Sequence, residues 1–150
     1  MEKKKQEKKE KPKLLAVIRI SGRVKIKSDI ENTLDRLRLR RKYSCILLNS
    51  EKKDIKGMLD KVKFYVAYGE INEETLIKLI KTRAHKVNKE TFNAVKTAQD
   101  LSKGKTLKEL GFKPFFRLHP PRKGIKSKLQ YPKGVLGDNK DISKLIERML

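Results

Sequence analysis

Up to residue 71, two kinds of apolar pattern succeed one another along the chain. Short runs rich in β-branched or aromatic residues are typical of strands, and they occupy residues 14–20 (LLAVIRI), 44–50 (SCILLNS) and 64–70 (FYVAYGE). Between them, apolar residues recur three and four positions apart, as in Ile55, Met58, Leu59 and Val62, which is the spacing of one helix face. The order of these segments predicts a β-α-β-α-β core over residues 14–71.

The first helix of this core is predicted to begin at Ser28. Ser28 and Glu31 have the spacing of a capping box, in which each side chain satisfies a backbone N–H at the helix start. Ile30, Leu34 and Leu37 then fall on one helical face. The helix is predicted to end in a dense group of cations: Arg36, Arg38, Arg40, Arg41 and Lys42.

Residues 72–110 predict a helical insertion. Asn72 can cap a helix, and acidic residues directly after it are favoured by the helix dipole. Asn88 is predicted to cap a further helix that carries Phe92, Val95 and Leu101. Thr106 and Glu109 repeat the capping-box spacing around a single turn.

Residues 111–150 predict an extended basic segment followed by a C-terminal helix. Residues 116–134 (FRLHPPRKGIKSKLQYPKG) contain three prolines, which favour an extended backbone, and no acid occurs from Gly111 to Gly137. Such a segment is expected to order on a polyanion, with Phe116 and Tyr131 either anchoring it to the body or stacking on bases. The helix is predicted from Ile142, Leu145, Ile146 and Met149.

Charge changes this picture more than any other property. The 150 residues include 40 Lys and Arg against 18 Asp and Glu, which gives a net charge of +22. A compact body with this excess repels itself unless an anion neutralises it, and nucleic acid is the usual source of that anion. A membrane surface is not favoured, because we find no apolar span, no amphipathic anchor and no Trp.

The first 13 residues, MEKKKQEKKEKPK, are predicted to be a disordered basic tail. Two interpretations remain open for this tail, a solubilising segment and a segment that folds onto RNA phosphates.

The sequence offers no catalytic, metal or cofactor site. His85 and His119 are the obvious acid–base candidates, and neither has an acidic residue nearby in sequence to orient it. One cysteine, Cys45, and two histidines cannot form a His/Cys metal cluster. No phosphate loop, nucleophile elbow or dinucleotide fingerprint occurs. We therefore expect no enzyme activity, no cofactor, no metal and no small-molecule substrate.

The basic clusters predict the binding surface. Five cations at one helix end exceed what dipole stabilisation explains, since one or two would satisfy it. Arg23, Lys25 and Lys27 alternate with apolar residues, as on one side of an extended loop. The predicted RNA-binding residues are Arg19, Arg23, Lys25, Lys27, Arg36, Arg38, Arg40, Arg41, Lys42, Arg117, His119, Arg122, Lys123, Lys126, Lys128 and Lys133.

Several motifs resemble one family. RISG at residues 19–22, TLDRLRLRRKYSCILL at 33–48 and KGMLDKVKFYVAYGEI at 56–71 resemble the L-thirty family of large-subunit ribosomal proteins. FRLHPPRKG at 116–124 and LIERM at 145–149 resemble its archaeal branch, which is related to the eukaryotic L-seven proteins.

This resemblance implies an α+β fold with a ferredoxin-like β-α-β-α-β core, and a structural role in translation without catalysis. It implies binding to large-subunit ribosomal RNA, contacts with neighbouring ribosomal proteins, and a location on cytoplasmic ribosomes. The alternative is a free-standing RNA-binding protein or RNA chaperone.

Overall fold

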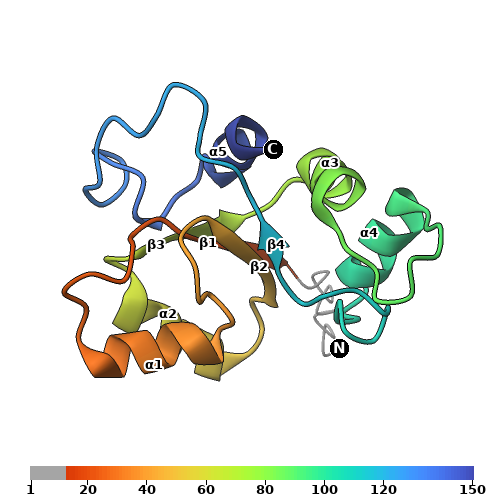
Figure 1. Cartoon of the computed structure of the whole chain (residues 1–150), viewed down its shortest axis with the longest axis horizontal. Coiled ribbons are helices and arrows are strands. Elements are labelled where there is room, and N and C mark those ends of the chain that lie inside the picture. Colours follow the sequence, from red (N-terminus) through yellow and green to blue (C-terminus); the bar gives the residue numbers. More distant parts are fainter. Residues whose placement is uncertain (1–12) are drawn as a thin grey trace, which may run out of the picture.

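The computed structural model describes residues 13–150, so the predicted basic tail lies outside the described residues except for Lys13. A five-stranded sheet runs through the middle of the molecule, with helices on both of its faces (Figure 1). The strand order is β4-β2-β1-β3-β5, and the bounds are Leu14–Arg19 (β1), Ser44–Asn49 (β2), Val66–Glu70 (β3), Phe116–Arg117 (β4) and Gly137–Asp138 (β5). The predicted α+β class is confirmed.

Strand β1 lies at the centre and is antiparallel to both β2 and β3. Its side chains alternate between two separate cores, as the two-residue period of a strand requires. Ala16 and Ile18 face one core and Val17 faces the other, and all three are fully buried. Both faces of β1 are covered, which explains why its sequence is almost continuously apolar.

Helices α1 (Ser28–Arg36) and α2 (Lys53–Val62) cover the face of Val17. Leu34 and Val62 are fully buried there, whereas Met58, on the same predicted face, is half-buried. The predicted capping box is wrong, because Lys27 is the N-cap of α1 and no side chain caps the helix. Ser28 is instead the first residue of the helix.

Helices α3 (Glu73–Arg83), α4 (Ala94–Ser102) and α5 (Ile142–Met149) lie against the other core (Figure 1). Leu79 of α3, Leu101 of α4 and Ile146 of α5 belong to one buried cluster with the strands. The predicted helical insertion and the predicted C-terminal helix therefore both contribute to the core of the sheet.

Of two helix caps predicted between residues 88 and 109, one is wrong and one is confirmed. Asn93, not Asn88, caps α4, and its side chain accepts hydrogen bonds from the N–H groups of Val95 and Lys96. The second capping box is confirmed: Thr106 N–H donates to Glu109 Oε2 over 3.0 Å, and Glu109 N–H donates to Thr106 Oγ1 over 3.4 Å.

Candidate nucleic-acid interface

The cations after α1 lie on a loop and not on a helix end. Helix α1 ends at Arg36, and Arg38 has a positive φ of 62°. We call residues 36–42 the arginine loop. Leu37 and Leu39 are buried, while Arg38 and Arg40 are exposed. The two leucines thus anchor the loop to the body, and the cations between them are presented to solvent. Only Arg36 lies where the helix dipole acts, so dipole stabilisation explains one cation of the group.

Arg19 holds this loop from inside the protein. Its side chain is fully buried, and one terminal nitrogen (Nη1) donates to the carbonyl of Leu39 over 2.6 Å. Its other N–H groups donate to the carbonyls of Ser21 and Gly22. Burial is the main cause that lowers the pKa of Arg19, yet an arginine keeps its proton in such a site. The prediction that Arg19 binds RNA is therefore wrong, because its guanidinium is engaged with carbonyls in the interior.

Pairing of β2 with β4 brings Arg117 to the arginine loop. Ser44, which follows the loop, pairs with Arg117 across the antiparallel ladder. Together they enclose a hollow of about 580 Å³, which we call the arginine hollow. Its lining residues are Asp35, Arg36, Arg38, Arg40, Arg41, Ser44, Phe115 and Arg117.

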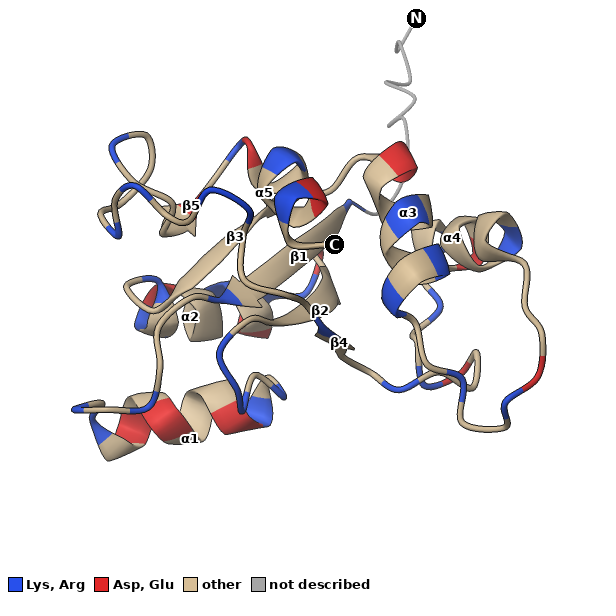
Figure 2. Cartoon of the chain, turned by 45° about the horizontal axis from the view of Figure 1, so that its top comes forward, with Lys and Arg blue, Asp and Glu red and all other residues tan. Residues whose placement is uncertain are grey.

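Five of these lining residues are arginines, and Asp35 is the only acid among them. One oxygen of Asp35, Oδ1, is buried and has no hydrogen-bond partner within residues 13–150. Figure 2 shows acids along α1 and cations on the loop that leads from α1 to β2. The hollow is therefore a concave, strongly positive site, with guanidinium groups from two distant segments of the chain.

The loop of residues 22–27 approaches the arginine loop. Arg23 Nε donates to the carbonyl of Arg40 over 2.9 Å. Lys25 has a φ of 58° and lies in a turn, so the predicted extended geometry of this loop is wrong. Arg23, Lys25 and Lys27 are all exposed, and the turn directs them differently from a row along a strand.

The predicted basic segment, residues 117–133, is tied to the C-terminal end of α5. His119 N–H donates to the carbonyl of Met149, and Arg122 N–H donates to that of Arg148, both over 3.0 Å. The guanidinium of Arg148 donates back to the carbonyl of Arg122. These hydrogen bonds attach residues 119–122 to the end of α5.

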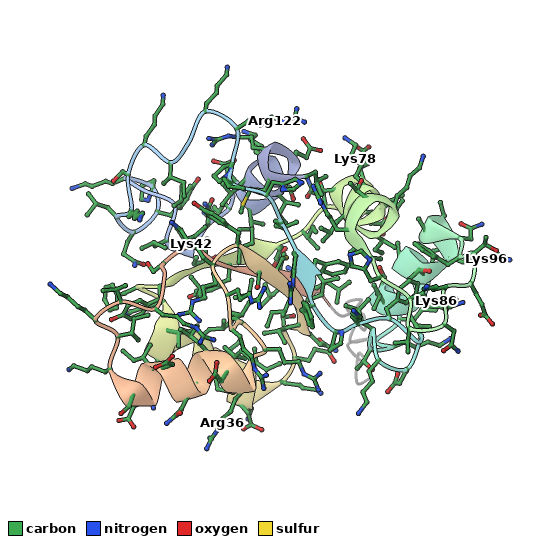
Figure 3. All side chains as sticks on the ribbon, viewed as in Figure 1. Arg36, Lys42, Lys78, Lys86, Lys96 and Arg122 are labelled. Atoms are coloured by element: carbon green, nitrogen blue, oxygen red, sulfur yellow. The ribbon has the colours of Figure 1, made fainter. Side chains whose placement is uncertain are left out.

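Exposed cations continue along this segment, at Arg122, Lys123, Lys126, Lys128 and Lys133. In the view of Figure 3, Lys42 lies between Arg36, at the end of α1, and Arg122, beside α5.

Three aromatic residues near these cations have different surroundings. Phe116 is fully buried, which excludes it from base stacking, and the hydroxyl of Tyr131 donates to Asp141 over 3.2 Å. Phe115 lines the arginine hollow with the guanidinium of Arg117 5.6 Å from its ring centre. Phe115 is not among the residues predicted from sequence, although its position two residues before Arg117 was a signal.

Other kinds of site are not seen in the part of the chain that the structure describes. Over residues 13–150, no three His, Cys, Asp or Glu side chains gather as metal ligands. None of the described helices is both long enough and apolar enough to cross a membrane.

Comparison with known proteins decides the family. A sequence model of the family described as Ribosomal protein L30p/L7e matches residues 15–66, which include the arginine loop. The protein called large ribosomal subunit protein uL30 of Archaeoglobus fulgidus is 42% identical, over 91% of this chain and 99% of its own length. The chain belongs to the uL30 family. The predicted resemblance is confirmed, and because uL30 proteins are structural, so is the prediction that the chain is not an enzyme.

Further uL30 proteins match over most of this chain. The protein of Nanoarchaeum equitans is 44% identical, over 77% of this chain and 81% of its own length. That of Staphylothermus marinus is 37% identical, over 93% of this chain and 99% of its own length. These relatives bear out the archaeal type that the sequence motifs indicate.

Proposed function

We propose that this uL30 family member is a structural constituent of the large ribosomal subunit that binds ribosomal RNA through the arginine hollow. The observation that carries the proposal is the convergence of five arginines on one concave site. Like charges gathered in this way repel one another, and an anion seated among them removes that cost. The relatives named large ribosomal subunit proteins support the ribosomal context.

Arginine suits RNA phosphate better than lysine does at such a site. Its planar fork donates two parallel hydrogen bonds to phosphate oxygens, and it is weakly hydrated. The hollow, at about 580 Å³, is within the range of sites that enclose small molecules, so it has room for a stretch of phosphodiester backbone. A concave site fits a protruding turn of folded RNA better than it fits a smooth duplex.

The neighbouring loops extend this surface in the proposal. Arg23, Lys25 and Lys27 lie on one side of the arginine loop, which Arg23 contacts directly. On the other side, the basic segment supplies exposed cations. Of the residues predicted from sequence, the proposed interface keeps all except Arg19. Neighbouring ribosomal proteins are proposed as further partners.

Sedimentation separates this function from that of a free RNA chaperone, the alternative. The full chain should co-sediment with large subunits and stay bound through moderate-salt washes, because many phosphate contacts act together. Recovery of the chain mainly in the soluble fraction would support the chaperone instead.

A further inference from the structure

Strand β2 has an outer edge that is only partly covered. On one side it pairs with β1 from Cys45 to Asn49. On the other side it pairs with β4 at Ser44 and Cys45 alone. Among residues 13–150, no strand pairs with residues 46–49 on that outer side. An uncovered edge is a template for another extended chain.

The register shows which backbone groups face outward. Alternate residues of an antiparallel strand bond to the same neighbour. Ser50 N–H donates to Lys13 on the side of β1, whereas the carbonyl of Tyr43 accepts from Leu118 on the side of β4. Even-numbered residues of β2, in step with Ser50, therefore bond to β1, and odd-numbered residues, in step with Tyr43, face the other side. Leu47 and Asn49 thus direct their N–H and C=O groups away from β1.

The chain before β4 does not cover these groups. In the register of β2 with β4, Pro114 would stand opposite Leu47, and proline has no N–H to donate. The next residue back, Lys113, donates its N–H to the carbonyl of His85 over 2.9 Å, so the chain turns away from β2.

A groove of about 330 Å³ follows this edge. Its lining residues come from β2, from the end of α1, from α2 and from residues 104–108. Its apolar lining residues include Leu37, Ile46, Leu48, Ile55 and Leu107. No Asp or Glu lines it. Lys52 and Lys108 belong to this groove and not to the arginine hollow, whereas Arg36 and Arg38 line both. Lys105 also lines the groove and pairs with Asp100 over 3.2 Å. We call these cations the rim of the groove.

We propose that this groove binds an extended, acidic segment of a neighbouring protein as an added strand on β2. The proposal rests on the proposed function, because the partner is a neighbour within the large subunit. A peptide offers both donors and acceptors to Leu47 and Asn49, whereas RNA phosphates only accept and would face their carbonyls. Acidic side chains match the cationic rim, and alternate apolar side chains fit the apolar lining residues. The chain's own first 12 residues carry more Lys than Glu, so the rim repels them.

A model peptide tests the edge directly on the full-length chain. The probe is a peptide of about ten residues in which Glu and Val alternate, and its twin carries N-methyl groups on alternate amides. Exchange of the Leu47 and Asn49 amides, followed by NMR, should slow at least about tenfold with the probe and not with the twin. Unchanged exchange, or slowing by single-stranded RNA in place of the peptide, would overturn the proposal.

Charge reversal supplies the matched control. The double variant Lys52→Glu/Lys108→Glu should bind the peptide about tenfold more weakly, because two rim contacts become repulsive. Lys96→Glu/Lys140→Glu makes the same change of net charge at exposed positions that do not line the groove, and should bind within about twofold of wild type. Equal weakening by both variants would show non-specific attraction and reject the groove.

Assembled subunits separate this proposal from the function on which it rests. Lys52, which lines the groove, is replaced by a photoreactive residue in chains that are built into large subunits. Cross-linking to a neighbouring protein supports the inference. Incorporation with cross-links to RNA alone rejects the inference and leaves the proposed function intact. Failure of the wild-type chain to enter subunits rejects the proposed function itself.

Discussion

Replacement of Arg19 by Met removes the buried guanidinium that ties β1 to the arginine loop. Three hydrogen bonds are lost, and the carbonyl of Leu39 is left buried without its donor. An unsatisfied buried carbonyl costs about 1–3 kcal/mol, and each of the two part-buried bonds contributes about 0.5–1.5 kcal/mol. Relief from burying a charge offsets part of this loss. We expect the free energy of unfolding to fall by about 3 kcal/mol.

Thermal and urea unfolding of the full chain measure this loss. For a chain of this length, about 3 kcal/mol corresponds to a Tm lower by about 6–12 °C. Arg19→Lys keeps the charge but replaces the fork by one ammonium group, so its loss of stability should be intermediate.

Arg23→Met is the matched control, because it removes the same charge from an exposed side chain that bonds the same loop. Its unfolding free energy should stay within about 1 kcal/mol of wild type. Equal losses for Arg19→Met and Arg23→Met, or a loss below about 0.5 kcal/mol for Arg19→Met, would refute the structural role of Arg19.

Three further outcomes follow from burial and exposure. Leu59→Ala should lower the unfolding free energy by about 2–5 kcal/mol and Met58→Ala by less, because Leu59 is buried and Met58 is half-buried. Equal losses in urea unfolding would show that α2 does not bury Leu59 more deeply than Met58. Burial raises the pKa of the Cys45 thiol to about 12, so a thiol reagent at pH 8 should modify only unfolded chain, and rapid labelling of folded chain would contradict this. Within residues 13–150, trypsin should cut the free chain first at residues 122–133, and bound RNA should suppress these cuts. Equal cleavage of this segment with and without RNA would exclude it from the interface.

The elements of the sheet core could be predicted because their patterns are local. Runs such as residues 14–20 are short and apolar, and the helix faces repeat every three or four residues. The end of α1 was predicted too late, since Arg and Leu both favour helices. The alternation Leu37-Arg38-Leu39-Arg40 has a period of two, and this was the signal that the helix had ended.

The arrangement of the site could be predicted only in part. Local sequence identifies the cations, but not the pairing of Ser44 with Arg117 across more than 70 positions. That pairing depends on tertiary packing and creates the arginine hollow. The burial of Arg19 had a local signal in the sequence. Arg19 lies within an apolar run and two positions after Val17, so it faces the same side of the strand, and that side is covered.

A salt titration of RNA binding tests the arginine hollow most directly. Arg40→Ala/Arg41→Ala removes two exposed cations that line it, and Lys96→Ala/Lys103→Ala removes the same charge from exposed positions at α4. If both arginines meet phosphates, the slope of log affinity against log salt should flatten by about 1.4–1.8 for the arginine variant, with thermal stability retained. The α4 variant should keep the wild-type slope. An arginine variant with wild-type slope and affinity would contradict an RNA-binding role for the arginine hollow.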